Sequence, residues 1–322
     1  MTTLRNDVGP EPSSLYEDAR RLLSRFGADI ECAERPENGA SNEVWLADQV
    51  VLRVSRSPDG SLEREAALAA ILPLEVGYPA VLGCGTDGGV EWMVTERLPG
   101  INLERAWRDL DSSARIDAVH DLWSRLHAAH RTDVDAARRI GCTSTPFYAL
   151  EKKNARNLLD SLTEQQVVDP ALRRRLRDIL DQMFGELSRV PVVLTHTDAG
   201  PNNTVWTATQ AVPIDFEFAC VAPADLELEN LFRTLSWQPG WDASPYLRDR
   251  VGELLTKPGA HARLRGYAVL RDLWALRLWL RKAQLDSEVN GRGVDADDLQ
   301  TWAPLLHLRA HADRTSWLAK IC

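Results

Sequence analysis

The sequence lacks any apolar run long enough to cross a membrane as a helix. Its most apolar stretch, residues 66–76, is interrupted by Pro73 and Glu75, whereas a membrane-spanning helix needs about 20 consecutive apolar residues. Residues 1–14 are polar and contain two prolines, which is unlike a secretory signal. We therefore expect a cytoplasmic protein without a membrane partner.

Cysteine is scarce and shows no pairing pattern. The five cysteines are far apart in the chain and contain no Cys-x-x-Cys pair. This distribution argues against a disulfide framework and against a zinc site, and it is typical of a protein kept in a reducing cytoplasm.

Positive charge is in the minority, and lysine contributes little of it. Lys and Arg together number 38 against 47 Asp and Glu, which gives a net charge of −9. A net negative field repels a phosphate backbone and no basic patch stands out, so nucleic acid is not expected as a partner. All five lysines lie at position 152 or later. The first half therefore has no lysine with which to hold a phosphate group.

The length of 322 residues allows one large or two modest domains. The first part of the chain contains an amphipathic helical pattern at 14–26, then short strand patterns and a second helical pattern at 61–72. The strand patterns lie at residues 30–33, 43–46, 50–54, 80–82 and 90–96. Five strands with one intervening helix predict a small antiparallel sheet layer.

Beyond the turn-forming stretch Leu98-Pro99-Gly100 the pattern becomes mostly helical, with a strand-rich island at residues 192–216. The helices are expected at residues 112–130, 147–162, 170–187, 224–235, 244–255, 262–285 and 299–318. The sequence thus predicts an α+β protein of two lobes with a cleft between them. Residues 1–98 form a small antiparallel-sheet lobe, and residues 99–322 form a larger, mostly helical lobe.

The strand-rich island gathers polar side chains that suit phosphate chemistry. An apolar strand ends at His196 and Asp198, a Gly-Pro turn leads to Asn203, and a second apolar run ends at Asp215. Phosphoryl transfer needs a carboxylate that orients or deprotonates the attacking hydroxyl, and oxygen ligands from Asn and Asp that hold Mg²⁺ on the nucleotide phosphates. We therefore expect these side chains at the mouths of adjacent short strands, in one site.

The spacing His-x-Asp-x-x-x-x-Asn, followed by an Ile-Asp-Phe-Glu whose Asp lies twelve residues after the Asn, resembles the catalytic core of the aminoglycoside phosphotransferase family, which is related to protein kinases. The resemblance implies a protein-kinase-like fold, with Asp198 as the catalytic base and with Asn203 and Asp215 as Mg²⁺ ligands. It also implies that His196 braces the catalytic loop. Glu217 would reach the water shell of the metal or an amine of the acceptor; the alternative is an exposed residue at a strand end.

The resemblance extends into the N-terminal lobe, where it implies a nucleotide site. Val51-Leu52-Arg53-Val54 occupies the third-strand position at which many kinases carry lysine. A guanidinium can hold phosphate oxygens bidentately, so we predict that Arg53 replaces the lysine; an outward-facing strand arginine is the alternative. Glu65 is its expected partner, because it falls on the apolar face of its helix, where a buried acid needs a cation.

Two loops complete the implied nucleotide site. Residues 38–42 resemble the loop that positions the nucleotide phosphates, and Ser41 and Asn42 would touch them, although the loop is poor in glycine. The stretch after the fifth strand resembles the hinge between the lobes, where main-chain groups of Glu96 and Leu98 would bind the adenine or guanine edge. The implied cofactors are therefore Mg²⁺ and ATP or GTP.

The family phosphorylates hydroxyls of aminoglycosides, macrolides and other antibiotics, and of metabolites such as choline, homoserine and sugars. We therefore predict an antibiotic phosphotransferase, with a kinase of choline or ethanolamine, homoserine or a sugar as the alternative. The acidic loop 286–298 is typical of a solvated loop, and the alternative is a lip that attracts a cationic acceptor. The tryptophans of the C-terminal part would suit a less polar acceptor, although Trp274 and Trp279 at helical spacing are more typical of a core. The tryptophans of this part are Trp237, Trp241, Trp274, Trp279, Trp302 and Trp317. We expect a monomer or a homodimer.

Two alternatives belong to other classes of protein. The arginine at position 53 and the glycine-poor loop are also features of a pseudokinase-like module that binds nucleotide without transferring phosphate, whereas the complete set Asp198, Asn203 and Asp215 favours an enzyme. A metal hydrolase built on His196, Asp198 and Asp215 would need further ligands, and the other histidines show no matching spacing.

Overall fold

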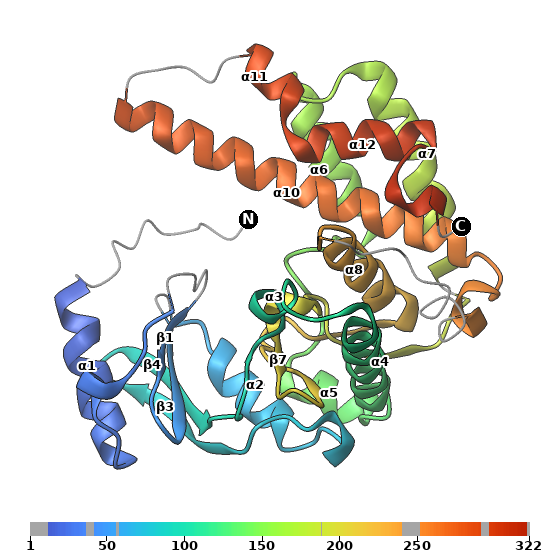
Figure 1. The fold of residues 1–322 in the computed structure, drawn as a ribbon. Helices are drawn as coiled ribbons and strands as arrows, with labels where there is room; N and C mark the ends of the chain where they lie inside the picture. The colour runs from blue at the N-terminus through green and yellow to red at the C-terminus, as the bar shows by residue number, and fades with distance from the viewer. Residues whose placement is uncertain are drawn as a thin grey trace.

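The computed structural model describes residues 12–36, 42–55, 58–187, 189–239, 252–290 and 296–320. Within these ranges the chain forms two lobes (Figure 1). The smaller lobe, coloured blue to cyan, holds an antiparallel sheet with helices on it, and the larger lobe is mostly helical. This is the predicted α+β architecture.

The N-terminal lobe is built on four antiparallel strands in the order β1-β2-β4-β3. They are β1 (Asn42–Leu46), β2 (Val50–Ser55), β3 (Val81–Asp87) and β4 (Val90–Glu96). Leu52 and Val54 of β2 pack into the apolar core beneath helix α1 (Pro12–Arg25). Helix α2 (Ser61–Ala69) covers the other face, where its Leu62 packs on Met93 of β4. Because successive strand residues point to opposite faces, Arg53 is delivered to the α2 side.

The strand predicted at residues 30–33 is wrong. These residues form a short 3₁₀ turn, and only Glu34 bridges to β1. The carboxylate of Asp29 accepts the main-chain N–H of Glu31 at 3.0 Å, and an aspartate that bonds the backbone two residues on favours a turn over a strand. The sheet in the described part of the lobe therefore has four strands and not five.

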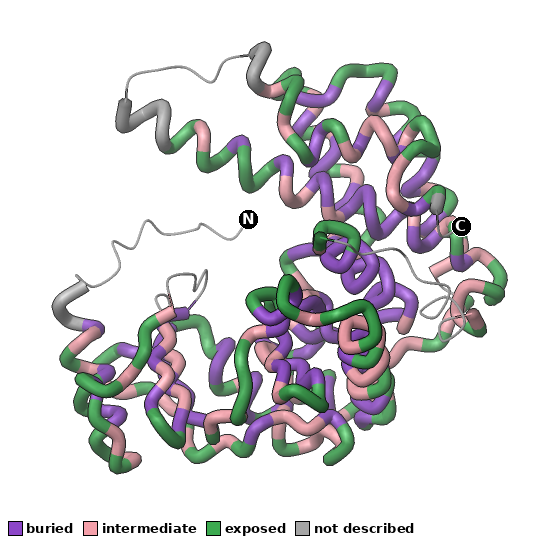
Figure 2. Tube along the Cα trace, viewed as in Figure 1, coloured by how far each residue is buried: buried purple, intermediate pink, exposed green. Residues whose placement is uncertain are grey.

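The C-terminal lobe is mostly helical. Its described helices are α3 (Leu103–Ala106), α4 (Ser112–Ala129), α5 (Val134–Ile140), α6 (Lys152–Glu164), α7 (Pro170–Leu187), α8 (Ala224–Ser236), α10 (Ala260–Asn290), α11 (Ala296–Thr301) and α12 (Ala303–Asp313). Helices α6, α7, α10 and α12 enclose one apolar core, and α3, α4 and α8 surround a second. Helix α8 is buried along nearly its whole length, as the purple tube in Figure 2 shows. None of the described helices combines the length and apolar composition needed to cross a membrane.

Two predicted helices have different limits in the structure. The helix predicted at 147–162 begins only at Lys152. The helix predicted at 299–318 is interrupted, and its central part, α12, ends where Arg314 adopts a left-handed conformation with φ of 59°. Most of the helix predicted at 244–255 lies outside the described residues. These differences leave the two-lobed architecture unchanged.

Two small antiparallel sheets frame the loop that carries the predicted catalytic residues. One has the strand order β5 (Ile101–Asn102), β7 (Thr204–Trp206), β8 (Ala211–Pro213), and in the other β6 (Val192–Thr195) pairs with β9 (Cys220–Pro223). The predicted island thus holds β6, β7 and β8, whereas β9 was not predicted. The pairing of β5 with β7 needs Gly100, since a Cβ there would collide with the carbonyl of Trp206.

Candidate active site

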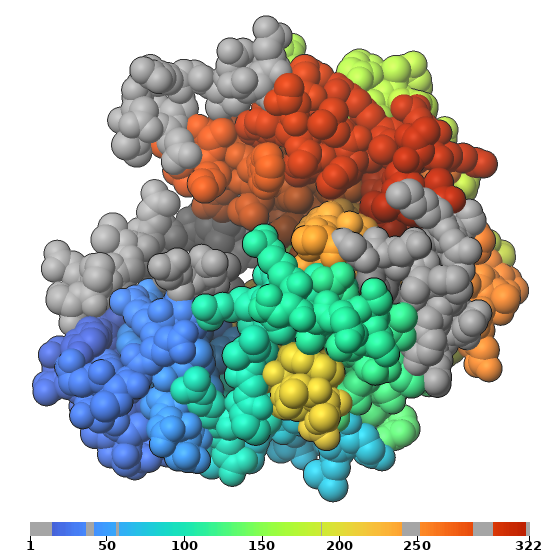
Figure 3. Space-filling model, viewed as in Figure 1, coloured from blue at the N-terminus to red at the C-terminus, as the bar shows by residue number. Residues whose placement is uncertain are grey.

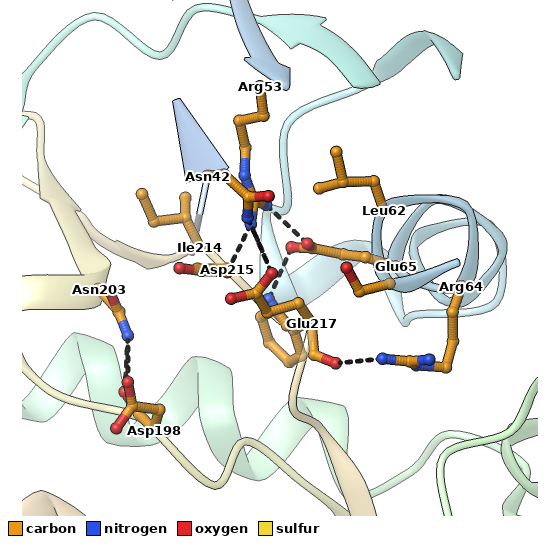
Figure 4. Close-up of polar contacts among 12 residues, drawn as sticks. Asn42, Arg53, Leu62, Arg64, Glu65, Asp198, Asn203, Ile214, Asp215 and Glu217 are labelled. Atoms are coloured by element: carbon orange, nitrogen blue, oxygen red, sulfur yellow. Dashed lines mark hydrogen bonds and ion pairs between the residues drawn. The ribbon is translucent and has the colours of Figure 1, made fainter. Parts of the chain in front are cut away.

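The loop between β6 and β7 brings Asp198 and Asn203 into contact (Figure 4). The Nδ2 atom of Asn203 donates to the carboxylate Oδ2 and to the main-chain oxygen of Asp198, each at 3.0 Å. The Asp198 side chain is 23% exposed. Asp198 is therefore a carboxylate held in one orientation but open to solvent. Because the amide nitrogen of Asn203 is engaged, its amide oxygen is the atom that can ligate a metal.

His196 is buried beneath this loop. Its Nε2 lies 2.8 Å from the carbonyl oxygen of Ile214, which can only accept, so we assign the ring proton to Nε2. Its Nδ1 then accepts the main-chain N–H of Asp198 at 3.3 Å. The ring packs on Phe216, with centroids 4.4 Å apart. These contacts tie the loop to the chain segment before Asp215, and they leave no ring nitrogen to carry a proton to a substrate.

A carboxylate on α8 holds the same loop and was not predicted. Glu227 is fully buried, accepts the main-chain N–H of His196 at 2.6 Å, and lies 2.6 Å from Nε2 of His130. The sequence shows acids at 225, 227 and 229 within one helix. They would indicate partners elsewhere in the fold only if that helix were known to be buried, because buried acids need partners. The sequence does not reveal that α8 is enclosed by both cores.

Asp215 follows β8 and adopts a left-handed backbone conformation, with φ of 67°. Non-glycine residues rarely do so, and such conformations concentrate at functional sites. The pairing of β7 with β8 places this residue beside Asn203, since the N–H of Ile214 donates to the carbonyl of Asn203 at 2.9 Å. The structure thus gathers Asp198, Asn203 and Asp215 at one place.

Arg53 links the N-terminal sheet to this place. Its Nη1 bonds Oε2 of Glu65 at 2.6 Å, and its Nη2 lies 2.7 Å from Oδ1 of Asp215 and 3.4 Å from Oε2 of Glu217 (Figure 4). Burial by itself would lower the pKa of Arg53, but the charges of Asp215 and Glu65 outweigh burial and hold this pKa well above its ordinary value. Arg53 therefore faces inward as a permanent cation, and the outward-facing alternative is excluded. Its contact with phosphate stays a prediction.

Glu65 on α2 is buried and has further partners besides Arg53. Its Oε1 accepts the hydroxyl of Tyr78 at 2.8 Å and the main-chain N–H of Phe216 at 2.6 Å. Burial raises the pKa of Glu65, and the positive charge of Arg53 opposes that rise. The expected pairing with Arg53 is present, and the bond to Phe216 joins α2 to the segment that carries Asp215. The Tyr78 contact was not predicted.

Glu217 is buried, which corrects the alternative that it is an exposed residue at a strand end. Only 3% of it is exposed, and its Oε2 accepts Nδ2 of Asn42 at 2.8 Å. Burial, and then the charge of Asp215, raises the pKa of Glu217 to about 7. Its carboxylate, with those of Glu65 and Asp215, offers oxygens that lie within 4.8 Å of one another. Glu217 is thus part of the acidic group around Arg53.

The raised pKa of Glu217 predicts a pH-dependent stability of the ligand-free protein. The pKa of this carboxyl is 4.5 in the unfolded chain and about 7 in the folded protein, so its neutral form contributes to the free energy of unfolding. That contribution is fully present below pH 4.5 and is lost as the pH rises through 7. Glu217→Gln, which cannot ionise, should raise the melting temperature at about pH 8 by on the order of a few degrees and change it little at about pH 5. Thermal unfolding followed by circular dichroism checks this, and an equal difference at both pH values would contradict it.

The structure describes only some of the remaining residues that are predicted to bind the nucleotide. Ser41 lies outside the described residues, and Asn42 is buried with its amide on Glu217. The N–H of Glu96 donates to the carbonyl of Ala80 at 2.9 Å, so the carbonyl of Glu96 is the main-chain group left to meet a base. Leu98 lies two residues further on and is partly buried. The contacts of these residues with a nucleotide stay predictions.

The donor atoms at this place fit Mg²⁺. The amide oxygen of Asn203 and the carboxylate of Asp215 are hard oxygen donors, and the neighbouring acidic group contains neither cysteine nor histidine. Hard divalent cations prefer such ligands, whereas thiolates and imidazoles select softer metals. Arg53 engages Oδ1 of Asp215, which leaves Oδ2 for a metal. Asn203 and Asp215 would therefore hold Mg²⁺ together with nucleotide phosphates.

A small antiparallel-sheet lobe, a mostly helical lobe and a carboxylate-rich site at their junction define a kinase-like phosphotransferase. A profile of the phosphotransferase enzyme family, APH, matches residues 33–273, which is well over half of the chain. The chain therefore belongs to the phosphotransferase enzyme family.

Two curated relatives carry a more specific name. The aminoglycoside 3'-phosphotransferases of Streptomyces fradiae and Streptomyces ribosidificus are each 27% identical to this chain over 135 residues. The match covers 40% of this chain and 47% of each relative, which is about half the length of those proteins.

Solved structures of aminoglycoside phosphotransferases share the fold. The GDP complex of aminoglycoside 2'-phosphotransferase-IIIa superposes with a TM-score of 0.67 at 19% identity and covers 93% of this chain and 98% of that one. The GDP and kanamycin complex of APH(2")-IIia gives 0.66 at 18% identity, over 89% and 97% of the two chains. A complex of APH(4)-Ia with ADP and hygromycin B gives 0.65 at 19% identity, over 92% and 96%. The predicted two-lobed, protein-kinase-like fold is therefore confirmed.

Proposed function

We propose that this protein transfers the γ-phosphate of ATP or GTP, with Mg²⁺, to a hydroxyl of a small molecule, and that the acceptor is an aminoglycoside-type or other antibiotic. The observation that carries the proposal is the meeting of Asp198, Asn203 and Asp215 beside the buried cation Arg53. The names of the curated relatives, and the nucleotides and antibiotics in the titles of the similar structures, support the antibiotic as acceptor.

Asp198 is the proposed base. The acceptor O–H would lie against its partly exposed carboxylate, which takes the proton as the acceptor oxygen attacks the γ-phosphorus. The bond from that phosphorus to the bridging oxygen breaks, and the nucleoside diphosphate leaves. Asn203 holds the carboxylate in place through its amide nitrogen. Because the transition state of phosphate transfer is loose, positioning and charge neutralisation contribute most of the rate.

Arg53 and the metal ligands would hold the nucleotide. Arg53 has five N–H donors. One on Nη1 bonds Glu65 and those on Nη2 bond Asp215 and Glu217, so the second donor of Nη1 and the N–H of Nε can contact phosphate oxygens. Asn203 and Asp215 would hold Mg²⁺, which when bound neutralises phosphate charge. The main chain at Glu96 and Leu98 would receive the base, and Ser41 and Asn42 would lie near the phosphates. In this proposal His196 braces the loop.

We divide the chain into a nucleotide-binding lobe, residues 1–98, and a lobe of residues 99–322 that holds the catalytic and acceptor-binding groups. Strand β5, directly after the boundary, pairs with β7 of the second lobe, which supports the division. The proposed enzyme acts in the cytoplasm as a monomer or homodimer on a single small acceptor.

Mass spectrometry tests the proposed function. The protein is incubated with Mg²⁺ and either ATP or GTP, and with single acceptors such as kanamycin, hygromycin B, a macrolide, choline, ethanolamine, homoserine or a sugar. We expect one antibiotic or more to gain the mass of one phosphate group only when nucleotide and metal are both present. Phosphorylation of a metabolite alone would overturn the antibiotic as acceptor. Nucleotide binding without transfer to any acceptor would favour the nucleotide-binding module.

A further inference from the structure

The proposed base has a second partner that sequence reasoning did not identify. Arg271 on α10 donates from Nη2 to Oδ1 of Asp198 at 2.8 Å, on the carboxylate oxygen that Asn203 does not bond. Its side chain is only 14% exposed. A cation supplied by the chain therefore lies directly against the carboxylate that would receive the acceptor proton.

Aromatic rings surround this cation. The guanidinium carbon of Arg271 lies 3.9 Å from the ring centroid of Phe147, 4.8 Å from that of Trp274 and 5.9 Å from that of Tyr148. Its Nη1 is buried and has no hydrogen-bond partner. Several ring faces and one carboxylate form the kind of site that binds an organic ammonium ion. Here the chain fills the site with its own guanidinium.

The helix face that continues outward from Arg271 is apolar or basic. Residues 274, 278, 281 and 285 follow it at helical spacing, three or four residues apart. They are Trp274, the exposed Leu278 and Leu285, at 49% and 51%, and an exposed arginine at 281. In Figure 3 the orange segment that contains this part of α10 lies at the surface, above the lobe that carries the sheet. This face, which we call the α10 wall, contains no acid at the positions named.

The described side chains of the α10 wall therefore suit an acceptor without ammonium groups. On the described side chains of the α10 wall, ammonium groups of a polyamine would meet the arginines at 271 and 281 and the exposed Leu278 between them, and no carboxylate. The acidic loop of residues 286–298, whose alternative interpretation is a lip for a cationic acceptor, lies outside the side chains that the structure describes. An uncharged molecule with an apolar face matches the exposed leucines and the tryptophan.

We propose, on the basis of the phosphate transfer proposed above, that Arg271 occupies the cation position beside Asp198 and thereby determines acceptor specificity. The acceptor carries no ammonium group next to the reactive hydroxyl, and it lays an uncharged, largely apolar face along the α10 wall.

A binding experiment without nucleotide tests the filled cation position. Tetramethylammonium is titrated into the protein at constant ionic strength and followed by ligand-observed NMR. In Arg271→Ala the rings and Asp198 remain but the guanidinium is gone, so we expect this variant to bind the probe about tenfold tighter than the parent, or more. Arg271→Met, which fills the same space without charge, should bind no better than the parent. Equal binding by the parent and Arg271→Ala, with both folded by circular dichroism, would overturn the proposal.

A matched pair of acceptors tests specificity without requiring equal activity of the variants. Kanamycin and its fully N-acetylated derivative carry the same hydroxyls, and only kanamycin carries ammonium groups. The parent should show the higher kcat/KM with the acetylated compound, and in Arg271→Ala the ratio should move at least about tenfold toward kanamycin. A preference of the parent for kanamycin, or an unchanged ratio, would contradict the proposal. If no acceptor is phosphorylated at all, the proposed function fails, and the tetramethylammonium titration still decides the role of Arg271.

Discussion

Replacement of Asp198 by asparagine is expected to lower the rate of phosphate transfer about 10²–10⁴-fold, the usual contribution of a general base. Asparagine has nearly the same size, and its single amide oxygen can accept from only one of the two donors, Asn203 or Arg271; it cannot accept the hydroxyl proton. Nucleotide affinity should change little, because the contacts of Asp198 are with these two residues and not with Arg53. Release of nucleoside diphosphate measures the rate, and calorimetry with Mg²⁺ and nucleotide measures the affinity.

The matched control for this variant is Asp313→Asn. Asp313 is also paired with an arginine, Arg175, but it is about half exposed and belongs to the end of α12. We expect the control to keep the parent rate. Transfer at the parent rate by Asp198→Asn would show that another group takes the proton. A large loss of nucleotide affinity in Asp198→Asn would instead place Asp198 among the nucleotide ligands.

Replacement of Asp215 by asparagine is expected to weaken binding of the Mg²⁺–nucleotide by about 100-fold or more, since charge neutralisation by a bound metal contributes several kcal/mol. The substitution removes one negative charge from the proposed metal site and from the partners of Arg53. Asparagine tolerates the left-handed conformation found at this position, with φ of 67°, whereas alanine would add backbone strain. The asparagine variant therefore isolates the effect of the charge.

Calorimetry with and without Mg²⁺ measures this effect. The parent should bind nucleotide much more tightly with the metal than without it, and Asp215→Asn should lose most of that difference. Metal-dependent binding at the parent level in Asp215→Asn would contradict the assignment of Asp215 as a metal ligand. Thermal unfolding of the ligand-free variant provides the control for folding.

The part of the site that lies in one short segment of the chain could be predicted from the sequence, because its residues are close together along the chain. Asp198, Asn203 and Asp215 lie within one short segment in which β7 pairs with the next strand, β8, so this local pairing brings Asn203 and Asp215 together. The alternation of strand residues likewise predicts that Arg53 and the apolar residues beside it face opposite sides. The ion pair with Glu65 follows, because one apolar helix face must cover one sheet face.

The contacts that join distant segments could not be predicted in this way. Arg271 bonds Asp198, which lies 73 residues earlier in the chain, and Asn42 bonds Glu217, which lies 175 residues later. Such pairs depend on how α10 and the N-terminal sheet are placed, and the periodicity of a single helix or strand carries no information on that placement. A local side-chain bond, that of Asp29, also decided against the strand expected after α1.

The most direct test of the account is a crystal structure with Mn²⁺ in place of Mg²⁺ and a non-hydrolysable ATP or GTP analogue. The anomalous signal of manganese distinguishes the ion from water and from protein atoms. We predict a single strong peak, or a close pair, bonded to the carboxylate of Asp215 and the amide oxygen of Asn203, with the terminal phosphate facing Asp198. A manganese ion bound elsewhere, or a terminal phosphate turned away from Asp198, would contradict the account.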